Sequence, residues 1–332
     1  NDTVSNCNIG PAGSNLPTKG VHFGGSSNID PGTGNSGNAI TNNNIFDYFG
    51  AATTSAGIYV ATGTPNASFT NNKFYQTAQR AQTTGATHAA IQISNGAGNN
   101  YVISGNTIGF SNFSGTGIYD FVGIASGSKF YPIFLSTVGT TTATSVQGNT
   151  ITNISVSGPV SGTGPGAGAP FAGIIVVTGL TNIGNTAGNT IGSTSLASAI
   201  SVNSSAASAS EVYGIYYNAV TSPNISNNII GGITATNSNA SPNIIDLYGI
   251  RAQTNTVATN TILNNTVGFS AGPIINNSTN AGSQTYGIYS QTAGSVVTGN
   301  TISNLTSVAG SALTGSAATM IGLWVDNASS AA

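Results

Sequence analysis

The chain has 332 residues, of which only 4% are charged, and its formal net charge at pH 7 is −2. Five lysines and arginines cannot neutralise a track of phosphates, which excludes a nucleic-acid-binding protein. Asn, Thr, Ser and Gly make up just over half of the residues, a composition that excludes a helical bundle. No stretch approaches the roughly 20 apolar residues of a membrane-spanning helix, yet the chain is too apolar for a disordered linker.

A six-residue bend motif recurs along the whole chain with a mean period of about 37 residues. It consists of an apolar residue, any residue, Asn or Gly, Asn, any residue and a second apolar residue. In the first copy, Val4–Ile9, Cys7 replaces the second Asn. The later copies are Ile40–Ile45, Phe69–Phe74, Ile103–Ile108, Val146–Ile151, Gly188–Ile191 with its leading Ile183 set back by an insertion, Ile225–Ile230, Ile262–Val267 and Val297–Ile302.

A Gly-Ile dipeptide, or a close variant of it, alternates with the bend motif. In the fourth copy we choose Gly123-Ile124 over the nearby Gly117-Ile118, because Asp120–Ile124 matches both Glu211–Ile215 and Asp246–Ile250. The apolar residues of this second motif are Val21, Ile58, Ile91, Ile124, Ile174, Ile215, Ile250, Ile288 and Leu323.

Apolar residues five positions apart cannot share one face of a straight strand, where inward positions alternate. Both can point inward if the chain bends at the Asn or Gly pair between them, since these residues tolerate left-handed backbone. The Gly-Ile segment then adds another short inward-facing strand to each period. The sequence therefore predicts an all-β fold, a parallel β-helix or β-solenoid of about nine coils, as a single domain over residues 1–332.

Stacked coils would place the second Asn of each bend in one column. An Asn side chain carries two donors and an acceptor, and the inter-strand spacing of ~4.8 Å suits hydrogen bonds along such a column. For each residue alone, ordinary turn chemistry is the alternative explanation. We predict a structural ladder, with Cys7 in the first position, formed by Asn43, Asn72, Asn106, Asn149, Asn189, Asn228, Asn265 and Asn300.

The repeated Gly-Ile-Tyr and Gly-Asn-Thr-Ile sequences resemble the parallel β-helix repeats of the pectate-lyase-like superfamily, including its NosD-like members. This resemblance covers essentially the whole chain and implies a right-handed coil. The charge-poor texture is similar to that of surface repeat proteins of gliding-type bacteria, which implies an extracellular or cell-surface location. The lyases and hydrolases of the superfamily use clustered carboxylates, and the seven acidic residues here are mostly spread one per coil.

The residues that lengthen each coil fall mostly between the bend motif and the next Gly-Ile strand. We expect these inserts to lie along one flank, where they fold back over the solenoid or form a contact surface between molecules. Examples are Val156–Pro170, Gly192–Ser210, Gly232–Ile245 and Phe269–Gln284.

Neither chain end carries the polar capping element typical of monomeric solenoids. The segment before Val4 and the segment from Leu323 to Ala332 are complementary halves of one coil. Because an uncapped parallel sheet templates the addition of strands, we expect the coils to continue end to end, in a longer polypeptide or between stacked subunits.

Few side chains in the sequence are candidates for catalysis or metal binding. Glu211 and Asp246 share one position on adjacent coils, as Asp120 does elsewhere, and are weak candidates for a metal site. The alternative is a solvated strand edge with Arg251 as the counter-charge. His88 has no obvious acidic partner in the sequence, so we assign no catalytic residue, no metal and no cofactor.

One set of aromatic residues follows the inward apolar position. An aromatic strip can bind sugars, although cross-strand packing explains it equally well. This candidate ligand strip consists of Tyr59, Tyr216, Tyr289 and Trp324.

The sequence favours a nonenzymatic, extracellular structural protein, a filament or a surface adhesin stalk. Its expected partners are other copies or continuing coils at the ends, lateral neighbours through the loop flank and a polysaccharide, but neither nucleic acid nor a membrane. The alternative is a carbohydrate-binding or polysaccharide-degrading β-helix protein.

Overall fold

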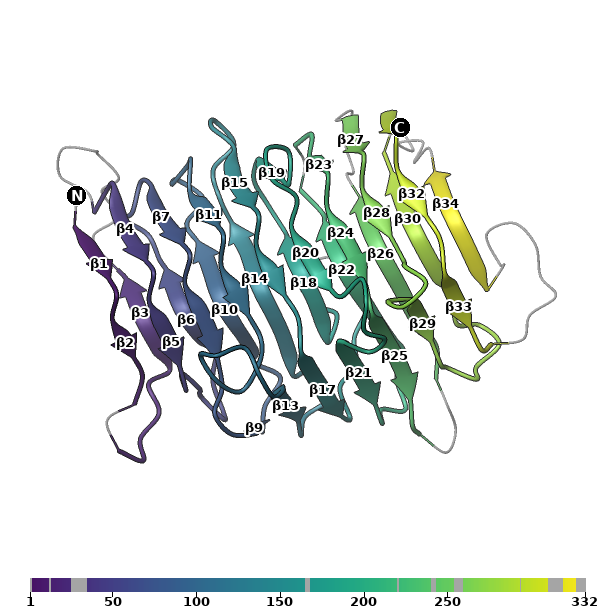
Figure 1. Ribbon diagram of the computed structural model, residues 1–332, viewed down its shortest axis with the longest axis horizontal. Helices are drawn as coiled ribbons and strands as arrows, with labels where there is room; N and C mark the ends of the chain where they lie inside the picture. Colours follow the sequence, from purple (N-terminus) through teal and green to yellow (C-terminus); the bar gives the residue numbers. More distant parts are fainter. Residues whose placement is uncertain are drawn as a thin grey trace.

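The computed structural model describes residues 2–11, 13–24, 35–164, 168–219, 221–239, 243–253, 259–292, 294–309 and 319–326. These residues form parallel β-strands and no α-helix, so no helix among them could cross a membrane. Successive coils stack from the N-terminal to the C-terminal end of an elongated body (Figure 1). The prediction of an all-β parallel solenoid with about nine coils is confirmed, since three of its sheets have nine strands each.

The bend motif supplies two of the sheets, one on either side of the bend. Sheet A consists of β1 (Thr3–Ser5), β4 (Asn38–Thr41), β7 (Ala67–Thr70), β11 (Val102–Ser104), β15 (Thr144–Gln147), β19 (Thr181–Ile183), β23 (Asn224–Ser226), β27 (Thr259–Leu263) and β31 (Gly294–Thr298). Sheet B consists of β2 (Asn8–Ile9), β5 (Asn44–Phe46), β8 (Lys73–Tyr75), β12 (Thr107–Ile108), β16 (Thr150–Ile151), β20 (Thr190–Gly192), β24 (Ile229–Gly231), β28 (Thr266–Val267) and β32 (Thr301–Ile302).

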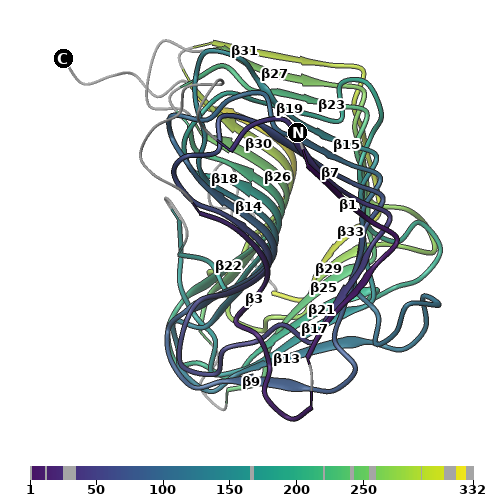
Figure 2. The same cartoon turned by 90° about the vertical axis from the view of Figure 1, so that its left-hand side faces the viewer.

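The Gly-Ile motif supplies sheet C, and a seven-stranded sheet D lies before it in the chain from the third coil onward. Sheet C consists of β3 (Lys19–Phe23), β6 (Ser55–Val60), β10 (Thr87–Ser94), β14 (Lys129–Thr137), β18 (Phe171–Val176), β22 (Ser210–Tyr217), β26 (Ile245–Gln253), β30 (Thr285–Gln291) and β34 (Met320–Asp326). Sheet D consists of β9 (Arg80–Gln82), β13 (Tyr119–Gly123), β17 (Ile154–Gly158), β21 (Ile200–Ser204), β25 (Ile233–Asn237), β29 (Ile274–Asn276) and β33 (Leu305–Ser307). The view from the N-terminal end shows these sheets as the walls of one coil (Figure 2).

The corner between sheets A and B has the geometry that the motif predicts. In eight of the nine copies, all except the one at Gly188, the first residue of the Asn or Gly pair has left-handed backbone, as in Asn42 (φ 56°) and Gly105 (φ 65°). This bend turns the flanking apolar residues toward one interior, where Ile40 is 2% exposed and Ile45 is fully buried. Complete burial of such a side chain contributes about 1.5–3 kcal/mol, so the stacked apolar columns hold the coils together.

The glycine of the Gly-Ile motif is required by a close approach between sheets C and B. A Cβ atom at Gly214 would lie 2.5 Å from the carbonyl oxygen of Gly249 and 2.8 Å from Cγ2 of Ile230. Any larger residue would therefore push the inward side chain of sheet B away from the core.

The predicted position of the fourth Gly-Ile copy, Gly123-Ile124, is wrong. Ile124 follows β13 of sheet D and is 55% exposed. The inward residue of that coil is Ile133, which pairs with Ile91 and Ile174 in sheet C. Pro132 occupies the glycine position there, so the dipeptide pattern could not identify the strand.

The inserts also differ from the expectation of a loop flank. They contribute the strands of sheet D, whose inward side chains enter the same core. Val156 is 1% exposed, and Val202, Ile233 and Ile274 are fully buried. The inserts thus complete the wall of the solenoid. The expected junction of the chain ends, from Asp326 to Ala332 and at Asn1, lies outside the described residues except for Asp326.

Candidate functional site

The asparagine column is a continuous run of hydrogen bonds in the wall of the solenoid. Asn72 Oδ1 accepts from the backbone N–H and from Nδ2 of Asn43, both at 3.0 Å. Asn72 Nδ2 donates to Asn106 Oδ1 at 3.1 Å and to the carbonyl oxygen of Ile40 at 2.8 Å. Both donors of the amide are therefore used, and its oxygen accepts twice. The side-chain bond recurs at 2.8–3.1 Å through Asn43, Asn72, Asn106, Asn149, Asn189, Asn228, Asn265 and Asn300.

The column has a direction, because each Nδ2 donates to the amide oxygen of the following coil. At the first position the backbone N–H of Cys7 donates to Asn43 Oδ1 at 2.9 Å. The Cys7 side chain has no amide oxygen, and its Sγ donates to the carbonyl oxygen of Ser5. A coil placed before Cys7 would therefore find no acceptor in this column.

Replacement of Asn149 by alanine tests the column. The substitution removes the acceptor of two Asn106 donors, and it removes the Nδ2 donor to Asn189 Oδ1 and to the carbonyl oxygen of Ile103, while the backbone N–H of residue 149 stays. Because unsatisfied buried polar groups cost about 1–3 kcal/mol each, we expect Asn149→Ala to lower the free energy of unfolding by about 3 kcal/mol. Chemical denaturation measures this loss. Asn182→Ala, a change of a partly exposed Asn on β19 outside the column, is the matched control, and an equal loss in both variants would contradict the assigned role.

The two carboxylates proposed as weak metal candidates lie on the outer face of sheet C. Strand pairing places Glu211 directly opposite Asp246, as predicted from their equivalent positions, whereas Asp120 lies in sheet D opposite Ser155. Glu211 Oε1 accepts from Arg251 Nη1 at 2.8 Å. Glu211 Oε2 accepts from the Tyr213 hydroxyl and from the backbone N–H of Gly164. Both oxygens of Glu211 are thus occupied by protein donors.

Aromatic rings surround the guanidinium of Arg251. Its Cζ atom lies between 5.0 and 5.9 Å from the ring centroids of Tyr213, Tyr216, Tyr248 and Tyr289. Tyr248 also stacks on Tyr213 at 5.2 Å. Cation–π contacts of this kind stabilise by about 0.5–2 kcal/mol each, so ion pair and rings together fix Arg251 in place.

The Asp246 carboxylate is bound by a backbone N–H group, whereas Glu211 pairs with Arg251. Its Oδ1 accepts from the backbone N–H of Gln284 at 2.8 Å. Burial raises the pKa of Asp246 to about 7; the charge of Glu211 adds to this rise, while the Gln284 hydrogen bond and Arg251 oppose it. A cation at this place would have to displace Arg251 or Gly164 from Glu211. Within the described ranges, no group of three or more His, Cys, Asp and Glu residues gathers to hold a metal ion.

The raised pKa of Asp246 predicts a specific pH dependence. Between about pH 4 and pH 7 the folded state binds a proton that the unfolded state has already released, so stability falls as pH rises through this window. Asp246→Asn keeps an oxygen for the Gln284 N–H and removes the titration. We expect the denaturation midpoint of Asp246→Asn, relative to the wild type, to increase from about pH 4 to about pH 7 and then level off. A constant difference over this range would contradict the assignment, and Asp2→Asn at an exposed position is the control.

The candidate ligand strip is not continuous. Tyr59, Tyr216, Tyr289 and Trp324 do share one register column, but three coils separate Tyr59 from Tyr216, and these place Gln92, Phe134 and Ile175 in the column. Tyr216 is fully buried and Gly164 lies close to its hydroxyl, so it cannot contact a ligand. Tyr59, Tyr289 and Trp324 are half-buried.

The structure contains a buried polar network around His88 that the sequence motifs do not predict. His88 is fully buried, with Nδ1 2.7 Å from the Ser55 hydroxyl and Nε2 2.7 Å from the Tyr119 hydroxyl. Burial, aided by the charge of Arg80, lowers its pKa to about 3. Ser55 and His88 interrupt otherwise apolar strands, which is the only signal that the sequence offers. Because the network lies inside the core, no substrate can reach it, and its role is to satisfy polar groups where sheet D begins.

No family model matches the chain, and neither a curated protein nor a solved structure is detectably similar to it. Strand pairing therefore carries the assignment of a parallel β-solenoid, and the relation to the pectate-lyase-like superfamily stays a prediction.

Proposed function

We propose that this protein is a nonenzymatic structural element of a bacterial cell surface, a filament segment or an adhesin stalk whose coils continue end to end. We place it among the NosD-like members of the pectate-lyase-like superfamily, with a right-handed coil and an extracellular location. The observation that carries the proposal is the uncovered face of the last described coil.

The apolar columns of that coil are open to solvent. Leu323 occupies the inward position of sheet C and is 47% exposed, whereas Ile288, one coil earlier, is fully buried. Val297 and Ile302 are only partly buried, although their counterparts in the preceding coil are fully buried. A further coil would bury these side chains and pair the free edges of the sheets.

The pairing of the charged side chains supports a structural role rather than a catalytic one. Glu211 is paired with Arg251, and Asp47 is paired with Arg80. With only 4% charged residues, little electrostatic repulsion opposes the approach of a second unit. Such a rod depends on backbone ladders, an aliphatic interior and the asparagine column.

End-to-end assembly can be tested at the two faces that would meet. Stacking would set Asn300 against Cys7, which lacks an amide oxygen, so Cys7→Asn should complete the column and lengthen the assemblies. Leu323→Asp places a charge in the contact and should abolish them. Negative-stain electron microscopy of the full chain, together with sedimentation, measures rod length.

Ile124→Asp is the matched control, because Ile124 is similarly exposed at 55% but lies on the side of the solenoid. It should leave rod length unchanged. Particles only one chain long for both the wild type and Cys7→Asn, or rods that persist in Leu323→Asp, would refute end-to-end stacking of this chain.

A further inference from the structure

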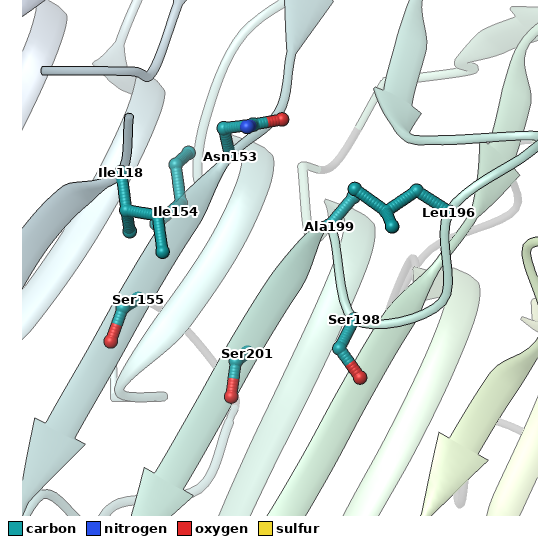
Figure 3. Close-up of a pocket in the computed structure, with 8 residues that line it drawn as sticks. All are labelled: Ile118, Asn153, Ile154, Ser155, Leu196, Ser198, Ala199 and Ser201. Atoms are coloured by element: carbon teal, nitrogen blue, oxygen red, sulfur yellow. The ribbon is translucent and has the colours of Figure 1, made fainter. Parts of the chain in front are cut away.

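A second set of exposed apolar side chains lies away from the coil ends, on two loops that project from the side of the solenoid. Phe113 is 59% exposed and Ile118 is 56% exposed in the loop between β12 and β13. Leu196, in the loop between β20 and β21, is 52% exposed. Between Ile118 and Leu196 is a groove of about 300 Å³ whose floor includes Ser155 and Ser201 of sheet D (Figure 3).

Hydrogen bonds brace the loop that carries Phe113. Asn112 Oδ1 accepts from the backbone N–H groups of Ser114 and Thr116, and Asn112 Nδ2 donates to the Thr116 hydroxyl at 2.6 Å. Lys73 Nζ donates to the carbonyl oxygen of Phe113 at 2.8 Å, which ties the loop to sheet B. The Phe113 ring is therefore presented by a rigid support, which lowers the entropic cost of inserting it into a partner.

Both loops also contain strained backbone. Phe110 has a φ of 67° and Ser198 has a φ of 57°. Most other non-glycine residues with positive φ in the described chain are asparagines, which tolerate this conformation far better. Strain of this kind costs about 1–3 kcal/mol per residue and persists where it shapes a functional surface.

We propose that the groove between Ile118 and Leu196 receives Phe113 from a second copy of this chain, in a side-by-side pair of solenoids. Phe113 lies five residues before Ile118, in the loop that forms one wall of the groove, so one two-fold contact can insert each Phe113 into the partner's groove and close the pair. This contact does not depend on end-to-end stacking.

The lack of charged residues around the groove favours a second copy of the chain as the partner. None of the residues that line the groove is charged, and the one cation beside Phe113, Lys73, is bound to a carbonyl oxygen. A typical soluble protein has about 25% charged residues and would lose the hydration of some of them on this flank. Only 4% of this chain is charged, so two copies bury apolar rings and hydroxyl groups at little such cost.

Sedimentation velocity of the full chain in the Leu323→Asp background, from micromolar to submillimolar concentration, isolates the lateral contact from end stacking. We expect a reversible dimer whose dissociation constant rises at least about tenfold on Phe113→Asp and on Leu196→Asp. Ile124→Asp, at a similarly exposed residue just after β13 and outside the groove, is the matched control and should dimerise unchanged.

A second measurement locates the contact. With Cys7 replaced by serine, a mixture of Phe113→Cys and Leu196→Cys chains should form a disulfide-linked pair under mild oxidation, whereas Phe113→Cys with Ile124→Cys should not. A parent Leu323→Asp chain that stays monomeric throughout, or dimers that Leu196→Asp does not weaken, would overturn the proposal. Either result leaves the end-to-end proposal standing, since that depends on rods formed by the wild type.

Discussion

The structure depends on how the chain satisfies its backbone at the corner between sheets A and B. A left-handed residue turns the chain, and the next backbone N–H then faces along the solenoid axis, out of register with either sheet. The side-chain oxygen of the asparagine in the following coil accepts it, as Asn106 does for Asn72. Because buried N–H groups must be paired, a buried bend is stabilised by the asparagine one coil later, and this hydrogen bond couples each coil to its neighbour.

The same requirement explains the composition. Once the corners are satisfied by amides and the walls by backbone pairing, cohesion comes from inward Ile, Val and Phe, and charged groups contribute little. Two ion pairs, Asp47 with Arg80 and Glu211 with Arg251, are largely enclosed in the wall. Glu211 also accepts a hydrogen bond from the backbone N–H of Gly164, which holds the loop that contains Gly164 against the outer face of sheet C.

The parts of the fold that the sequence predicts are those with a local signature repeated in every coil. The bend motif fixes two apolar residues and one amide per period, which is enough to locate sheets A and B and the asparagine column. Sheet D has no such signature, because its strands are short, begin only in the third coil and are rich in Ser and Thr. The misplacement of Ile124 has the same origin, since Pro132 removed the dipeptide on which the register depended.

The contacts of the Arg251 site could be predicted from the sequence only in part. The register of Glu211 and Asp246 follows from the period, but the ring of tyrosines around Arg251 joins side chains from three coils, and the Gly164 contact comes from a distant insert. No local pattern encodes such convergence. The exposed apolar residues are distributed more simply: most lie either on the last coil or on the side of the solenoid, largely on its projecting loops. Burial of these two groups of side chains would drive the two proposed contacts, one along the solenoid axis and one along its flank.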